Sequence, residues 1–178
     1  MTIMHKILDG NVLDIIERPE MIPRINGTKS FSSVMVDPIL YLSKTVYNTL
    51  SELGTLTSII FEQKPHVDKG NVHIDLVPTK PALNIVIEGQ GVMKWFSPIG
   101  EGEVFTHPLI GIDYRAWFKP YYGTVLEEWT TGKIALVRTD VPHQVFNLED
   151  STRLIASIRW TATLSWEETL EWFNKKWK

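Results

Sequence analysis

After residue 55, hydrophobic and polar positions follow the short period of β-strands rather than that of helices. The candidate strands are rich in β-branched and aromatic residues and are separated by Pro, Gly, Asn and Asp. They are TLTSIIFE (55–62), LNIVIEG (83–89), GVMKWF (91–96), KIALVRT (133–139), HQVFNL (143–148) and TRLIASIRW (152–160). No helical period interrupts them, so the pattern predicts an antiparallel sandwich or jelly roll rather than parallel βαβ units.

A helical period precedes these strands. Asp37 can cap a helix, Pro38 can occupy its first turn, and Gly54 can end it. The pattern therefore predicts an N-terminal helix at about 38–53. Its apolar face contains Ile39, Leu42, Val46, Leu50 and Leu53.

A second helical pattern follows the strands, in SWEETLEWFNKKWK. Ser165 and Glu168 have the spacing of a capping box, which predicts a C-terminal helix at about 166–177. The residues expected to face the protein are Trp166, Leu170, Phe173 and Trp177. We expect both helices to pack against the outside of the sheet.

We find no repeat, low-complexity tract or linker that divides the chain. The sequence therefore predicts a single domain, residues 1–178, with a jelly-roll core at about 55–160. The segment 97–131 is rich in Gly, Pro and aromatic residues, and we interpret it as a long irregular loop that acts as a binding element.

Composition limits the chemistry. The 178 residues include no cysteine, so a metal would be held by His, Asp and Glu rather than by sulfur. The net charge of −3 argues against a nucleic-acid partner. No apolar run approaches the ~20 residues that span a bilayer, and no leader is seen, so we expect a cytoplasmic protein without a membrane partner.

The stretch NVHIDLVPTKPALNIVIEG contains the first candidate site. His73 and Asp75 are two residues apart, so on a strand their side chains point to the same side. A buried imidazole and a buried carboxylate need a partner. His143, which opens a predicted strand, is the candidate third ligand, and two His with one carboxylate form the facial triad of non-haem Fe(II) oxygenases.

Two alternatives affect these assignments. His66 and Asp68 have the same spacing as His73 and Asp75, but they lie in a stretch that is typical of an exposed loop, so we prefer the later pair. His5 is expected to be exposed, and His107 lies in the long loop, where it could contact substrate.

Arg153 opens the strand TRLIASIRW ten residues after His143. Arg153, Ser157 and Arg159 share one face of this strand. A buried arginine needs an anionic partner, which a carboxylate of a bound molecule would supply. Arg159 is the alternative to Arg153 in this role.

The series HID, ALNIVI, MKWF and VPHQVFN, followed by an arginine, resembles the Fe(II)- and 2-oxoglutarate-dependent oxygenases, particularly small phage and bacterial members. The resemblance covers about residues 60–160. It implies a double-stranded β-helix with flanking helices. It also implies that the Fe(II) ligands are His73, Asp75 and His143. The residues implied for 2-oxoglutarate are Arg153, which holds its distal carboxylate, with Asn84 and Ser157 beside it and Trp95 as a pocket wall.

The resemblance further implies a dioxygenase that hydroxylates a small-molecule or peptidyl substrate and releases succinate and CO₂. Asp75 favours hydroxylation, because family members that halogenate have a small residue there. If the chain is encoded by a phage, we expect the protein in the cytoplasm of the host cell.

Two other readings stay open. A cupin-type metal-dependent dioxygenase or isomerase shares the barrel, although its first motif has His-x-His where this chain has His-x-Asp. A noncatalytic jelly-roll module could bind a ligand through YRAWFKPYY, in which Arg115 and Trp117 are candidates for substrate recognition. The aromatic ends also leave room for a homodimer.

Overall fold

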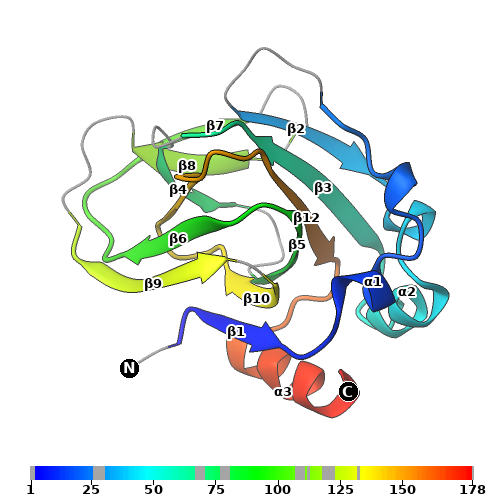
Figure 1. The fold of residues 1–178 in the computed structure, drawn as a ribbon. Coiled ribbons are helices and arrows are strands. Elements are labelled where there is room, and N and C mark those ends of the chain that lie inside the picture. Colours follow the sequence, from blue (N-terminus) through cyan, green and yellow to red (C-terminus); the bar gives the residue numbers. More distant parts are fainter. Residues whose placement is uncertain are drawn as a thin grey trace.

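The computed structural model describes residues 3–25, 31–66, 71–76, 81–106, 111, 113–117, 123–131 and 133–177. In this part of the chain, the strands form two six-stranded antiparallel sheets (Figure 1). The first sheet has the order β1 (His5–Leu8), β10 (Ile134–Arg138), β5 (Pro81–Glu88), β12 (Arg153–Trp160), β3 (Leu56–Gln63) and β2 (Phe31–Val36). The second has the order β7 (Glu103–Thr106), β8 (Asp113–Trp117), β4 (Val72–Asp75), β11 (His143–Phe146), β6 (Gly91–Phe96) and β9 (Val125–Thr131).

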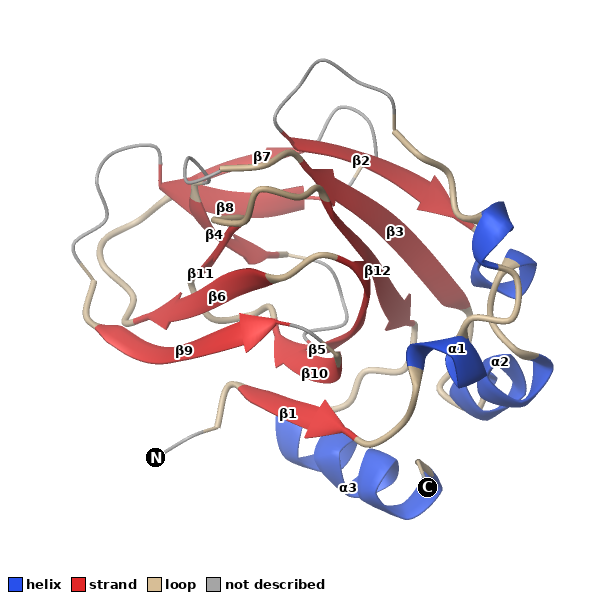
Figure 2. Ribbon diagram, viewed as in Figure 1, coloured by secondary structure: helices blue, strands red, loops and turns tan. Residues whose placement is uncertain are grey.

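This arrangement confirms the predicted jelly roll, a double-stranded β-helix with helices outside it. The helices are α1 (Val12–Ile15), α2 (Lys44–Ser51) and α3 (Trp166–Lys176), with 3₁₀ turns at Pro19–Met21 and Pro38–Leu40. They lie beside the first sheet, away from β7, β8 and β9 (Figure 2). Within the described residues, no helix is long and apolar enough to cross a bilayer.

The main hydrophobic core lies between the first sheet and the helices. Its members include side chains from alternate positions of four strands together with residues from the helices. Among them are Leu83, Ile85, Ile134, Leu136, Leu154, Ala156, Ile158, Trp160, Leu50 and Phe173. Because side chains alternate along a strand, the residues between these positions face the second sheet. The interior-facing residues of β5 and β12 therefore include Asn84, Arg153, Ser157 and Arg159.

The segment expected to form one helix at 38–53 is divided in two. Asp37 caps a 3₁₀ turn, Pro38–Leu40, and the α-helix begins only after Ser43. Between them, the carbonyl of Tyr41 accepts hydrogen bonds from two backbone N–H groups of the preceding segment, and Leu42 forms a β-bridge with Ile16. These tertiary contacts interrupt the helical period.

The C-terminal helix follows its sequence signal closely. Ser165 and Glu168 form the expected capping box. Trp166 and Phe173 are buried, and Leu170 and Trp177 pack against the same core.

The interpretation of 97–131 as an irregular loop is wrong for its described part. It contains β7, β8 and β9, which pair into the second sheet. Many positions of these strands are exposed, and polar residues are interspersed among the apolar ones, so they lack the apolar run that identified the buried strands. Strands β1 and β2 were likewise not predicted, because they lie at the edges of the first sheet.

One row of side chains crosses the interior face of the second sheet. Directly paired residues in antiparallel strands point to the same side. From β7 to β9, the successive pairs are Glu103–Ala116, Ala116–His73, His73–His143, His143–Trp95 and Trp95–Glu127. The two candidate histidines are thus direct cross-strand neighbours.

The first strand closes one side of the barrel. β1 pairs with β10 of the first sheet, while His5 Nδ1 and the backbone N–H of Met4 contact the carboxylate of Glu127 in the second sheet. The His5 ring also stacks on Trp95 and Trp129, with ring centroids 5.7 and 4.8 Å away. The expectation that His5 is exposed is therefore wrong, since its side chain keeps only 18% of its accessible surface.

Candidate metal centre

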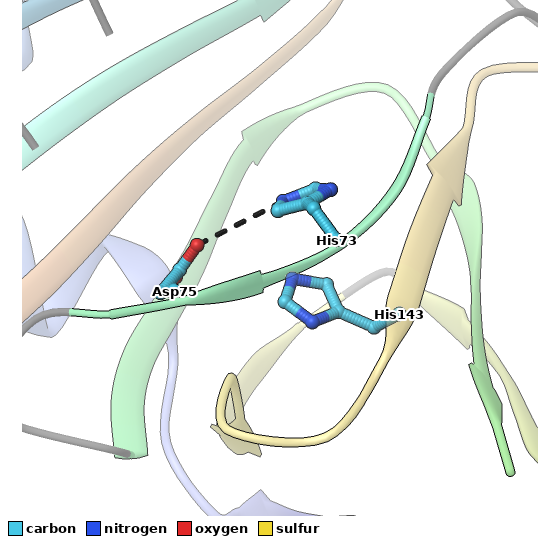
Figure 3. A group of neighbouring side chains, drawn as sticks. All are labelled: His73, Asp75 and His143. Carbon is cyan, nitrogen blue, oxygen red and sulfur yellow. Dashed lines mark ion pairs between the residues drawn. The ribbon is translucent and has the colours of Figure 1, made fainter. Parts of the chain in front are cut away.

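The three predicted metal ligands come together inside the barrel. His73 and Asp75 lie on β4 and His143 on β11, and their side chains point toward one another (Figure 3). One ligand atom from each can be chosen so that all three lie within 4.8 Å of one another. Two imidazoles and a carboxylate that converge this closely can hold a divalent transition-metal ion and leave coordination positions open.

Backbone carbonyls orient both imidazoles. His73 Nδ1 lies 2.9 Å from the carbonyl oxygen of Asn71, and His143 Nδ1 lies 2.9 Å from that of Val141. A carbonyl only accepts, so each Nδ1 carries the proton. Each Nε2 therefore keeps its lone pair for a metal, as expected of metal-binding histidines.

Arg159 orients Asp75. Its Nη2 donates to Asp75 Oδ2 at 2.5 Å, and Nη1 donates to Thr139 Oγ1 at 3.3 Å. Asp75 Oδ1 stays on the side of His73, 3.8 Å from its Nε2. Burial alone would raise the pKa of Asp75, but the positive charge of Arg159 and its hydrogen bond to the carboxylate outweigh burial and lower this pKa below its ordinary value. Asp75 is therefore a carboxylate at neutral pH, as a metal ligand must be.

His143 is neutral at the same pH. Its side chain is buried, and burial together with the neighbouring His73 lowers its pKa from 6.5 to about 4. A neutral imidazole beside an ionised carboxylate is the protonation state that binds metal. The donors, their tautomers and their charges thus all fit a divalent transition metal.

A second polar site surrounds Arg153. This residue is 3% exposed, and its guanidinium donates to Gln63 Oε1 at 2.6 Å and to Thr131 Oγ1 at 3.2 Å. Both partners are neutral, and Arg153 forms no ion pair with a described residue. Burial lowers its pKa from the ordinary arginine value to about 9. A buried cation with neutral partners suits an anionic ligand.

The backbone around Arg153 leaves space for its long side chain. Gly91 on β6 lies beneath it, and a Cβ there would come within 2.7 Å of Arg153 Nε and 2.8 Å of its Cδ. The turn before Arg153 is held by Asn147, whose Nδ2 lies 2.9–3.2 Å from the carbonyls of Gln63, Lys64 and Ser151. The side chain of Arg153 therefore crosses the barrel from the first sheet to the second.

Two interior polar residues lie on the first sheet between these sites. Asn84 and Ser157 are direct cross-strand partners, and Ser157 lies between Arg153 and Arg159 on β12. Asn84 Oδ1 is buried without a hydrogen-bond donor in the described structure. Such an acceptor needs a donor from water or a ligand. On β6, Gly91 lies at the Arg153 site and Trp95 lies beside the candidate metal ligand His143. These two positions are ~13 Å apart along the strand, at ~3.3 Å per residue.

The alternative assignments lie elsewhere. His66 is exposed, has φ 55°, and pairs with Asp150 at 2.9 Å, so it does not join the metal group. Asp68 and His107 lie outside the described residues. Arg159 is already paired with Asp75. Arg115 and Trp117 pair with Ile74 and Val72, on the face opposite His73 and Asp75, so they point away from the candidate metal.

Several supporting residues were not identified from the sequence. Gln63 and Thr131 hold Arg153, and Thr139 holds Arg159 and also accepts the backbone N–H of Asp75 through its carbonyl. Each lies within or beside a strand, where a polar residue is usually solvent-exposed. Only the pairing of strands distant in sequence reveals their interior position.

No family model matches the sequence, and no curated protein matches it. Similar solved structures include oxalate decarboxylase from Bacillus subtilis, with 13% identity and a TM-score of 0.42 over 77% of this chain and 27% of that one. They also include peruvianin-I, a cysteine peptidase from Thevetia peruviana latex, with 14% identity and a TM-score of 0.42 over 84% of this chain and 73% of that one.

Proposed function

We propose that this protein is an Fe(II)- and 2-oxoglutarate-dependent dioxygenase that hydroxylates its substrate. The observation that carries the proposal is the pairing of two sites in one barrel: a His, Asp, His group and a buried arginine with neutral partners. A molecule that chelates a metal at one end and has a carboxylate at the other suits both sites. The resemblance of the sequence to this oxygenase family supports the same assignment.

Each residue has a distinct part in the proposed site. His73, Asp75 and His143 bind Fe(II) through two Nε2 atoms and one carboxylate oxygen. Arg153 binds the distal carboxylate of 2-oxoglutarate, whose negative charge compensates the buried guanidinium. Asn84 and Ser157 line the path between the two ends. When bound, Fe(II) and 2-oxoglutarate supply oxygen activation, with succinate and CO₂ as co-products of hydroxylation.

The structure favours Arg153 over Arg159 for the distal carboxylate. Arg159 is held by Asp75 and Thr139, so it supports the metal ligand instead. Trp95 lies behind His143 and is fully buried, with its Nε1 donating to the carbonyl of Arg138 at 2.9 Å. In the proposed site, Trp95 forms the pocket wall beside His143 and would exclude water from that side of the metal.

Anaerobic addition of Fe(II) and 2-oxoglutarate tests the proposal. We expect a visible charge-transfer band, because the keto group and adjacent carboxylate of 2-oxoglutarate chelate the metal. His143→Ala should abolish metal binding. Arg153→Gln should keep metal binding but weaken 2-oxoglutarate by about 10- to 100-fold, the loss expected for a buried charge-assisted pair. Arg24→Gln, which removes an exposed arginine paired with Glu88, is the matched control.

Metal binding without any 2-oxoglutarate-dependent band would refute the proposal and indicate another metal-dependent jelly-roll function. Absence of metal binding in the wild-type protein would indicate a binding module. If Arg153→Gln left 2-oxoglutarate affinity unchanged, the assignment of its carboxylate to Arg153 would be wrong.

A further inference from the structure

The candidate metal centre is closed on one side and leads to exposed strands on the other. Toward β9, His143 is followed by Trp95, which His5 and Trp129 cover. In the opposite direction, His73 is followed by Ala116 and then by Glu103 on the edge strand β7. A substrate that reaches the metal is therefore expected to lie along β8 and β7.

Two aromatic side chains lie on the interior face of β7 and β8. Tyr114 pairs with Asp75 across the strands, and its ring centroid lies 5.8 Å from that of His73 in an edge arrangement. Phe105 pairs with Tyr114, with ring centroids 3.9 Å apart. Both rings are partly exposed. They form an aromatic surface that begins beside two of the three candidate ligands.

A carboxylate extends this surface. Glu103 is exposed and is two positions from Phe105, so the two side chains share a face of β7. Glu103 forms no ion pair with any residue in the described ranges. Aromatic rings beside a carboxylate attract organic cations through ring faces and charge together.

We propose that Tyr114, Phe105 and Glu103 form the recognition surface for a substrate with a cationic side chain of the lysine or arginine type. The proposal rests on the proposed function, since it places the reacting carbon beside the metal. Glu103 lies two strands from His73, which is ~10 Å at ~4.8 Å per strand. The flexible stem of lysine or arginine can lie over the rings and bring its charged end toward Glu103.

Binding without turnover tests the surface directly. The full chain is loaded with Ni(II) and 2-oxoglutarate, and N-acetyl-L-lysine amide, N-acetyl-L-arginine amide and the uncharged N-acetyl-L-norleucine amide are titrated by calorimetry. We expect at least one cationic amide to bind about tenfold more tightly than the norleucine amide, as a charge-assisted contact predicts.

Two variants locate that preference. Glu103→Gln should reduce it to about twofold or less, and Tyr114→Leu should weaken both cationic and neutral amides, because it removes shared contact area. Glu128→Gln is the matched control, since Glu128 lies on the outer face of β9 and pairs with Lys94. Circular dichroism and thermal unfolding confirm that each variant is folded.

Equal affinities for the charged and neutral amides, or a preference that survives Glu103→Gln, would overturn the proposal. Such a result leaves the proposed function intact if the 2-oxoglutarate charge-transfer band is present. Conversely, selective binding of a cationic amide without that band would support the surface and refute the oxygenase assignment.

Discussion

Replacing Arg159 with methionine should destabilise the metal-free protein and make its stability depend more strongly on metal. The side chains of Arg159 and Asp75 are 7% and 13% exposed, and they are joined at 2.5 Å. Removing one partner of such a pair leaves the other charge buried, which costs about 3 to 5 kcal/mol. We expect Arg159→Met to lose about 3 kcal/mol of unfolding free energy, because Asp75 is still close to His73 and slightly exposed.

The double variant Asp75→Asn, Arg159→Met separates the pair from its surroundings. It removes both charges, so it should be more stable than Arg159→Met alone. Together with the single variant Asp75→Asn, it should give a coupling energy of about 2 kcal/mol or more. Urea unfolding in the presence of a chelator measures these values, followed by fluorescence of the tryptophans.

The same measurement in saturating Ni(II) tests the link to the metal. A bound cation compensates Asp75 in place of Arg159, so the cost of Arg159→Met should become smaller than in chelator. A loss below about 1 kcal/mol in chelator, the range of exposed ion pairs, would show that the pair is not buried in solution. An unchanged cost in Ni(II) would show that Asp75 does not bind the metal.

Three further predictions concern other parts of the protein. Because folding lowers the pKa of His143 from 6.5 to about 4, the unfolded chain binds a proton that the folded chain excludes. The metal-free protein should lose about 3 kcal/mol as pH falls through this interval, and His143→Gln should flatten that dependence in urea unfolding measured across pH. Ser165→Ala removes the N-cap of α3 and should cost about 1 kcal/mol in the same assay; no change would mean that the helix end is satisfied otherwise. Phe173→Ala leaves a cavity at a fully buried position and should lower the unfolding free energy by about 3 to 5 kcal/mol, visible as a lower melting temperature. A loss below about 1 kcal/mol would show that α3 does not pack on the core in solution.

The buried strands were predictable because both of their faces are covered, so apolar residues form nearly continuous runs in their sequences. β12 is buried throughout, and its sequence TRLIASIRW shows this directly. Strands such as β7 and β9 have an exposed face and polar residues, so their sequence does not separate them from loops. Their pairing within the second sheet decides their structure, and this information is not local.

The convergence of the three candidate metal ligands could be predicted because strand alternation places His73 and Asp75 on one side, and the position of His143 follows from a turn before its strand. The role of Arg159 could not be predicted from the sequence. Its spacing from Arg153 only shows that both face the interior, and which one meets Asp75 depends on how β12 crosses β4. Gly91 is a similar case, since its lack of a side chain matters only where Arg153 passes over it.

The closure of the barrel by β1 has a consequence for folding. Met4 contacts Glu127, which is 123 positions further along the chain, and His5 pairs with Val137 on β10. β1 can therefore dock only after β9 and β10, which lie far later in the chain, have formed. Contacts so distant in sequence close slowly, so the Trp95 side of the barrel is expected to be among the last parts to become protected from hydrogen exchange during refolding.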